Sequence, residues 1–201
     1  IAVIYRIRLE EPVLATSHRA EHMYAVYHAF IPGSMVRGLV AGLRLSENPN
    51  QDLAKDARSL LFDGQTLYLN AYLADDQWNR RLPAPFSWRK EKTRTEPQGD
   101  IEDFALLEQD ERGLETPTGV DDFASLHDTI VSLASPQRHI AVHTLRDRYA
   151  GRPTGAQGTL YRYEALASGE RFVGAILVSS QKDAKDLQAL LPEGYYNLGK
   201  A

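Results

Sequence analysis

The chain of 201 residues contains no cysteine. Disulfide bonds, thiolate metal sites and a cysteine nucleophile are therefore excluded within this sequence. No apolar run approaches the roughly 20 residues that a helix needs to cross a bilayer, and no secretory signal is visible. From these absences we expect a cytoplasmic protein.

Several catalytic signatures are missing as well. The sequence has no nucleotide-binding glycine loop, no serine nucleophile elbow and no paired-carboxylate motif. His139 and His143 are four residues apart, but no glutamate lies between them in the HExxH manner, and the segment is as compatible with a strand as with a helix. We therefore expect no catalytic residue, no metal ion and no cofactor.

The charge of the chain is unevenly distributed. The formal net charge is −4. Hydrophobic residues make up 43% of the chain and charged residues 25%, which is an ordinary composition for a globular protein. Residues 96–128 hold eleven acidic residues and one basic residue, Arg112. Outside that segment, 16 of the 27 acidic and 22 of the 23 basic residues remain, a balance of +6. A basic body with an acidic insertion favours a polyanion-binding protein that also docks a protein partner.

The periodicity of the apolar residues predicts an α+β fold. The predicted strands are 1–9, 65–73, 159–166, 171–178 and a last one from Tyr195, and the predicted helices are 34–45, 51–61 and 182–191. Segments 159–166 and 171–178, separated by Ser168-Gly169, are predicted to form a hairpin. Residues 74–156 contain six prolines and no sustained period, which predicts a long insertion with a short helix near 121–134. Without the insertion, the order βαββαβ is that of a ferredoxin-like, RRM-like domain.

The start of the first helix carries a candidate anion site. Pro32-Gly33 predicts a turn, and Ser34 is in position to cap the helix that follows. Ser34, Arg37 and the free amides of the first turn could together bind an anion. Gly38 and Gly42 lie on one helix face, which predicts close packing against a neighbouring backbone.

Several of these segments resemble the RAMP proteins of type III CRISPR effectors, and within them the Csx-ten group of type III-D systems, which is related to the handle-binding Cas-five group. The likeness covers most of the chain except the acidic segment, and its more specific parts are the first helix and the predicted Leu-Tyr-Arg-Tyr-Glu hairpin. The segments that carry it are Ile31-Pro32-Gly33-Ser34-Met35-Val36-Arg37-Gly38, Tyr68-Leu69-Asn70-Ala71-Tyr72, Leu82-Pro83-Ala84-Pro85-Phe86-Ser87-Trp88 with Lys90, Gly158-Thr159-Leu160-Tyr161-Arg162-Tyr163-Glu164, Phe172-Val173-Gly174-Ala175-Ile176 and Leu198-Gly199-Lys200.

The resemblance implies a ferredoxin-like RAMP domain spanning residues 1–201, interrupted by the insertion at 74–156 and belonging to a longer polypeptide. It implies a non-catalytic subunit of an antiviral ribonucleoprotein complex that grips the CRISPR RNA near its 5′ handle. The implied partners are that RNA, the large polymerase/cyclase-like subunit and other subunits, with target RNA nearby and no membrane. The piece Leu198-Gly199-Lys200 resembles the start of the family's glycine-rich loop.

Single-stranded RNA is bound by cations along its backbone and by flat rings against its bases. Ser34 and Arg37 match the family's RNA contacts in the first helix, and Lys200 belongs to the implied loop. The other candidates are cations that lie near the ring of Trp88 or of Tyr149 in the sequence. We expect the Trp88 ring itself to be packed in the protein rather than stacked on a base. The predicted RNA-binding residues are Ser34, Arg37, Arg89, Lys90, Lys92, Arg146, Arg148 and Lys200.

Three alternatives remain open at the level of the sequence. An endoribonuclease of the same fold could process CRISPR RNA with a histidine as general acid or base, either one of His18, His22 and His28 or one of His139 and His143. A backbone RAMP subunit could cut target RNA with an aspartate such as Asp147, although Arg146 and Arg148 favour a salt bridge there. A protein scaffold would contact the large subunit and no RNA.

Overall fold

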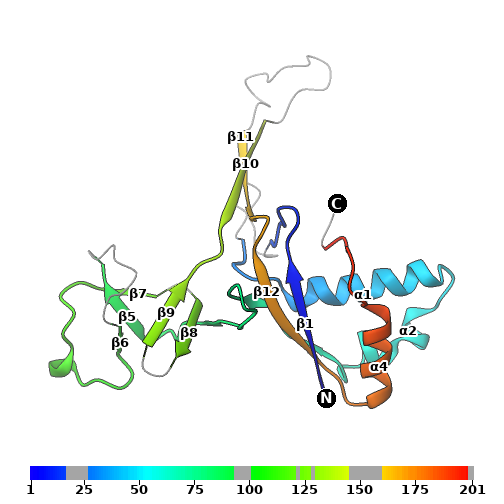
Figure 1. Cartoon of the computed structure of the whole chain (residues 1–201), viewed down its shortest axis with the longest axis horizontal. Helices are drawn as coiled ribbons and strands as arrows, with labels where there is room; N and C mark the ends of the chain where they lie inside the picture. The colour runs from blue at the N-terminus through cyan, green and yellow to red at the C-terminus, as the bar shows by residue number, and fades with distance from the viewer. Residues whose placement is uncertain (17–26, 93–100, 121–122, 128–129, 145–159, 199–201) are drawn as a thin grey trace.

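The computed structural model describes residues 1–16, 27–92, 101–120, 123–127, 130–144 and 160–198. They form a mixed α+β structure with antiparallel sheets, as the sequence predicts (Figure 1). The helices are α1 (Gly33–Glu47), α2 (Leu53–Asp56), α3 (Arg58–Leu61) and α4 (Gln181–Leu190), with a short 3-10 turn, η1 (Gln109–Glu111). The strands are β1 (Ala2–Arg8), β2 (Leu67–Tyr68), β3 (Tyr72–Leu73), β4 (Leu82–Pro83), β5 (Trp88–Glu91), β6 (Glu102–Asp103), β7 (Pro117–Gly119), β8 (Phe123–His127), β9 (Ile130–Ala134), β10 (Arg138–Thr144), β11 (Leu160–Leu166) and β12 (Arg171–Leu177).

The core sheet consists of β1, β12, β2 and β3. Strand β12 is central: it pairs antiparallel with β1 on one side and with both β2 and β3 on the other. Its middle residues, from Phe172 to Ile176, are all buried. A continuous apolar run of this kind is typical of a strand that is buried on both faces.

Helices α1 and α4 cover one face of this sheet (Figure 1). Val36 and Val40 of α1 and Leu187 of α4 are buried in the same apolar cluster as Phe172 and Ile176 of β12. The helical spacing of these residues directs one stripe of each helix toward the sheet. The burial of those stripes is what fixes the two-layer arrangement.

No helix of the described residues covers the opposite face of the core sheet, the helix-free face. Tyr5 and Ile7 of β1 point toward the helices and pack against the apolar core. Successive side chains of a strand point to opposite faces, so Ile4, Arg6 and Arg8 point away from the helices. Exposure agrees with this alternation, since Ile4 is 62% exposed. The register places Arg6 opposite Val173 and Arg8 opposite Arg171, on the same face.

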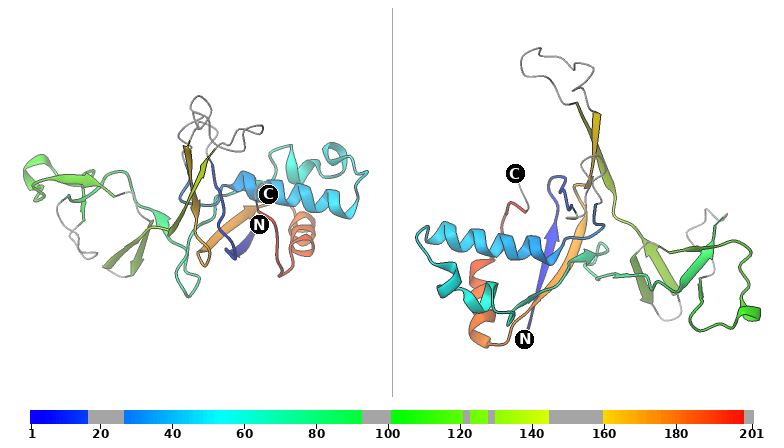
Figure 2. Two further views of the ribbon diagram at one scale, coloured as in Figure 1. Left: turned by 90° about the horizontal axis from the view of Figure 1, so that it is seen from above. Right: turned by 180° about the vertical axis from the view of Figure 1, so that it is seen from behind.

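The chain between β3 and β12 builds three further pieces. Strands β4, β8 and β9 form one small sheet, and β6, β5 and β7 form another. Strands β10 and β11 pair along their whole length and project away from the core sheet as a two-stranded hairpin (Figures 1 and 2). Phe123 of β8 joins the first small sheet to the core sheet, because its ring lies 5.7 Å from that of Tyr72.

Two sequence predictions about this region are wrong. The expected helix near 121–134 is a pair of antiparallel strands, β8 and β9, in the described part of that segment. The expected hairpin of 159–166 with 171–178 does not form: β11 pairs with β10, and β12 pairs with β1, β2 and β3. The turn at Gly169 has φ of +87° and carries the chain from one sheet into another, so proximity in sequence did not lead to pairing.

Other predicted elements differ in detail. The helix expected at 51–61 is split at Ala57 into α2 and α3. The strand expected at 65–73 is two short strands, because the five residues from Tyr68 to Tyr72 oppose only four on β12, from Val173 to Ile176, and this interrupts the alternation. Residues 195–198 are irregular rather than a strand. None of the helices in the described part of the chain is long and apolar enough to span a membrane.

Candidate nucleic-acid interface

The first turn of α1 differs from the sequence prediction. The helix begins at Gly33, one residue earlier than expected, so that Pro32 occupies the N-cap position and Ser34 does not cap the helix. The capping side chain is Asn70, whose Oδ1 accepts the N–H of Gly33 at 3.0 Å. The carbonyl of Pro32 accepts the N–H of Met35. Two amides of the expected anion site are therefore already bonded within the protein.

The side chains of the expected anion site remain accessible. Ser34 and Arg37 are both exposed, on a helix whose first turn contains no acidic residue. Gly38 and Gly42 are also exposed, and a Cβ at either position would meet no described atom within 4 Å. The predicted close packing of these two glycines is wrong: the close backbone approach is made by Gly33 instead.

Tyr68 lies beside the cations of α1. Burial raises the pKa of its hydroxyl to about 12, and the charges of Arg37 and Arg44 act in the opposite direction. The buried Tyr68 hydroxyl has no hydrogen-bond partner in the structure as described. The Tyr68 side chain therefore contributes packing under α1, and its hydroxyl contributes no hydrogen bond to the described residues.

We expect this tyrosine to make the protein sensitive to alkali. The pKa of about 12 in the folded state exceeds 10.0, the ordinary value expected after unfolding, so the folded state retains the proton longer. The free energy of unfolding should be unaffected by Tyr68 below about pH 10 and should fall between about pH 10 and pH 12. Chemical denaturation at several alkaline pH values should show a shallower decline for Tyr68→Phe. An identical decline in the two proteins would contradict the assignment.

The predicted cations of β5 have different environments. Arg89 stacks against Phe86 and Phe104, with its Cζ 5.8 Å and 5.9 Å from the two ring centroids. Its Nη1 also donates to the carbonyls of Phe86 and Trp88. Lys90 is half-buried, whereas Lys92 is exposed. Of these three, Lys92 is the one most accessible to an anion.

Trp88 is packed, as expected. Its Nε1 donates to Asp103 Oδ2 at 3.2 Å, and its side chain is half-buried on β5, the middle strand of this sheet. The hydrogen bonds from Trp88 and from neighbouring groups, foremost that of Ser87, lower the pKa of the Asp103 carboxyl. Trp88 is thus a structural residue of the small sheet β6–β5–β7.

The structure does not gather the predicted RNA-binding residues into one site. Ser34 and Arg37 belong to α1 on the core sheet, and Arg89, Lys90 and Lys92 belong to or follow β5 in a separate sheet (Figure 1). The remaining three candidates, Arg146, Arg148 and Lys200, lie outside the described residues. These assignments stay predictions.

The histidines show no catalytic arrangement among the described residues. His139 and His143 are both on β10, so the segment is a strand. His28 stacks against Phe30 with the ring centroids 4.7 Å apart. Within the described ranges no group of three or more potential metal ligands occurs. His18, His22 and Asp147 lie outside those ranges.

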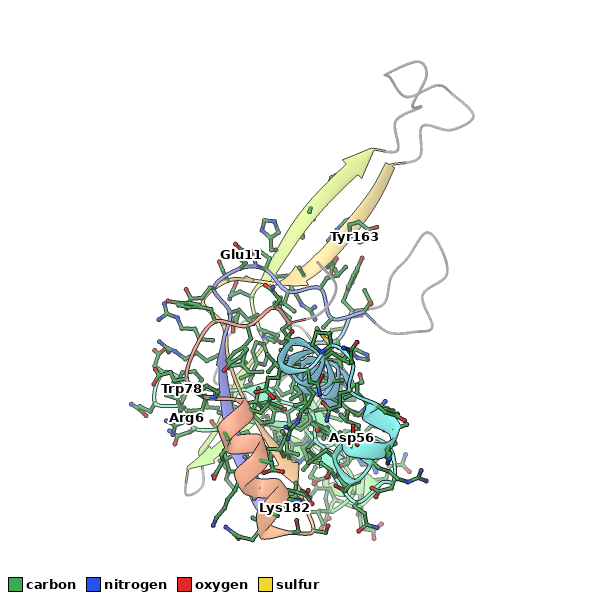
Figure 3. The ribbon with its side chains drawn as sticks, turned by 90° about the vertical axis from the view of Figure 1, so that its right-hand side faces the viewer. Arg6, Glu11, Asp56, Trp78, Tyr163 and Lys182 are labelled. Atoms are coloured by element: carbon green, nitrogen blue, oxygen red, sulfur yellow. The ribbon has the colours of Figure 1, made fainter. Side chains whose placement is uncertain are left out.

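A cluster of arginines and rings on the helix-free face is absent from the sequence predictions. The Cζ atoms of Arg6 and Arg171 lie 5.6 Å and 5.8 Å from the centroid of the Trp78 ring, and Figure 3 shows Arg6 and Trp78 next to each other. Arg80 stacks on Tyr72 at 4.8 Å. The alternation of residues 1–9 signals that Arg6 shares a face with Arg8, but only the tertiary structure brings residues 78 and 171 to them.

A groove runs beside β1, and within the described residues this strand pairs only with β12. The groove has a volume of about 590 Å³ and is lined by the end of β1, the turn that follows, Leu39 of α1 and residues 194–198. Arg6 and Arg8 belong to its lining, and so do Glu10 and Glu11. The groove therefore continues from the arginine-rich end of the helix-free face.

Comparison of the chain with known protein families found no matching family, and a search of curated proteins found no significant match. The function is therefore argued from the residues and the geometry described above.

Proposed function

We propose that this protein is a non-catalytic RNA-binding subunit of a type III, III-D-like CRISPR effector complex, which holds the guide RNA near its 5′ handle. In this proposal the protein contacts the large polymerase/cyclase-like subunit, and the insertion at residues 74–156 supplies contacts to neighbouring protein subunits. The core is a ferredoxin-like RAMP domain.

The arrangement of the core sheet supports the proposed fold. The spatial order β1–β12–β2 is that of the first, third and second strands of a ferredoxin-like sheet, with every neighbouring pair antiparallel. A helix follows β1 and another follows β12, and both pack on the same face. The fold permits many functions, so the functional part of the proposal depends on the site.

The observation that carries the functional proposal is the exposure of Ser34 and Arg37 at the start of α1. Both residues are exposed near the N-terminal, positive end of the helix dipole, and the first turn holds no acidic residue, which favours a phosphate group there. The contact would be to the sugar–phosphate backbone, which carries no sequence information by itself. Preference for the handle would then come from its shape and its unstacked bases.

The proposal is tested by the binding of labelled guide RNA to the full-length protein over a series of salt concentrations. The RNA carries either the intact or a scrambled 5′ handle. We expect tighter binding to the intact handle, weakening with salt. The double variant Ser34→Ala, Arg37→Ala should reduce the slope of log affinity against log salt by about 1, because one phosphate contact is lost. Arg58→Ala, which removes an exposed arginine of α3, serves as the control and should leave the slope unchanged.

Other outcomes would overturn parts of the proposal. Cleavage of the RNA to a discrete product would favour the endoribonuclease alternative. Affinity for the large subunit with none for the guide would favour a protein scaffold. Handle-dependent binding that is indifferent to the double variant would place the RNA contact elsewhere on the protein.

A further inference from the structure

The helix-free face concentrates positive charge at one end. Arg8 and Arg171 are directly opposite each other in the β1–β12 register, and Arg6 is two residues from Arg8 on the same face. Like charges in directly opposed positions of a sheet destabilise it. The apolar residue Ile4, 62% exposed, continues the same face toward the other end of β1. This is an unusual composition for a surface that would only face water.

The acidic partners of these arginines are themselves in solvent. Asp76 pairs with Arg171, but its side chain is 96% exposed. Glu10 lies 3.5 Å from Arg8, and the two side chains are 55% and 58% exposed. Exposed ion pairs contribute little to stability. Exchange of these carboxylates for the phosphates of a ligand would therefore cost little.

Trp78 is held over this end of the sheet in a strained conformation. Its φ of +67° is rare for a residue other than glycine. Asp75 stabilises the turn by accepting the N–H groups of Gln77 and Asn79. The result is one indole ring with two guanidinium groups, of Arg6 and Arg171, within 6 Å of its centroid. Strain of this kind at an exposed cluster of charges is characteristic of functional positions.

We propose that Arg6, Arg8, Arg171 and Trp78 form a binding platform for single-stranded nucleic acid. The three guanidinium groups contact phosphates, and the half-exposed indole of Trp78 holds two of them in place while offering a ring edge or face to a base. The groove beside β1, whose lining includes Glu10 and Glu11 as well as Arg6 and Arg8, continues the surface next to the platform. This inference rests on the proposed RNA-binding function and adds a surface that is separate from α1 and β5.

The two tryptophans of the chain make the platform directly testable. The variant Trp88→Phe leaves Trp78 as the reporter on the platform, and Trp78→Phe leaves Trp88 as the reporter on β5. Each protein is titrated with a short oligouridylate while the tryptophan emission is followed. We expect a saturable, salt-reversible change in the emission of Trp78. The Trp88 reporter, which is packed against Asp103, should give a smaller change or none.

A charge reversal supplies the second measurement. Arg6→Glu should lower the affinity for oligouridylate about tenfold or more, because a hydrogen bond to a charged group is replaced by repulsion. It should also lower the salt slope by about 1. Arg58→Glu makes the same change at an exposed arginine of α3 and should have little effect. A far-ultraviolet circular dichroism spectrum of each variant shows that the fold is kept.

The experiments distinguish a failure of the platform from a failure of the proposed RNA-binding function. If the wild-type protein binds oligouridylate while Trp78 emission and the Arg6→Glu variant show no effect, the platform is wrong and RNA binding stands. If the wild-type protein binds neither oligouridylate nor guide RNA, the proposed function fails and the platform fails with it. If Trp78 responds only to another protein subunit, the face is a protein interface and the nucleic-acid platform is wrong.

Discussion

Gly33→Ala should destabilise the protein by about 3 kcal/mol or more, the upper range for overpacking a closely packed site. A Cβ at position 33 would overlap the carbonyl oxygen of Tyr68, and it would also press on the carbonyl carbon of Leu69 at 3.2 Å. Backbone atoms of a paired strand cannot move aside as a flexible side chain can. The start of α1 would have to lift from β2, with loss of the Asn70 bond to the helix.

The same substitution elsewhere in α1 provides a matched control. Gly38 is exposed in the middle of the helix, and a Cβ there meets no described atom within 4 Å. Gly38→Ala should therefore raise the free energy of unfolding by about 0.5–1 kcal/mol through helix propensity alone. Urea denaturation of the two variants should show effects of opposite sign. Equal effects would mean that position 33 is not in close contact with β2.

Gly174→Ala should be the second strongly destabilising change, at about 2–3 kcal/mol. Gly174 and Tyr5 are directly opposite in the β1–β12 register, and the Tyr5 ring crosses the glycine so that its hydroxyl donates to the carbonyl of Leu69 at 3.1 Å. A Cβ on residue 174 would overlap the phenol of Tyr5 and approach the Cβ of Ala71 to 2.9 Å. The ring then has to leave the apolar layer under the helices.

A double-mutant cycle separates this contact from a general weakening of the sheet. In a Tyr5→Ala background the ring is absent, so Gly174→Ala should cost about 1–3 kcal/mol less than it does in the wild-type protein. Leu133→Ala, in β9 outside the core sheet, should combine additively with Gly174→Ala. Additive behaviour of the Tyr5 pair, measured by chemical denaturation, would show that the overlap is not the cause.

The sequence predicts those elements whose apolar period is long and uninterrupted. The strand at 1–9, the helix at 34–45 and the helix at 182–191 correspond to β1, α1 and α4, each within a few residues. In these segments the local preference and the burial in the core favour the same conformation. The α+β class follows from these elements and from β12, whose short apolar run Phe172–Ile176 has the length of a buried strand rather than that of a helix.

The wrong predictions are those that depend on pairing. Nothing local distinguishes a strand that pairs with its neighbour in the chain from one that pairs with a distant segment, which is why the hairpin of β11 with β12 was expected. Residues 123–127 and 130–134 are extended because they pair with each other in the β8–β9 ladder. That β8 and β9 are strands therefore depends on their pairing with each other and not on the sequence of either one alone.

At the start of α1, the residue that caps the helix and the glycine that packs closely both differ from the sequence prediction. The sequence places the cap at Ser34, but Asn70, 37 positions from Gly33 along the chain, accepts the amide. It assigns close packing to Gly38 and Gly42, but Gly33 makes the close approach. Ser34 and Arg37 keep the exposure that a binding role needs, because neither is required to complete the helix start.

By itself, the sequence determined the charge distribution, the absence of cysteine chemistry and the faces of the long helices and of β1, because composition and period are local properties. The tertiary structure decided which strands pair, which residue caps α1 and which glycines are indispensable. It alone brings Trp78, from the turn after β3, between Arg6 of β1 and Arg171 of β12. Such a cluster depends on contacts between residues far apart in the chain, and no periodicity within one segment contains that information.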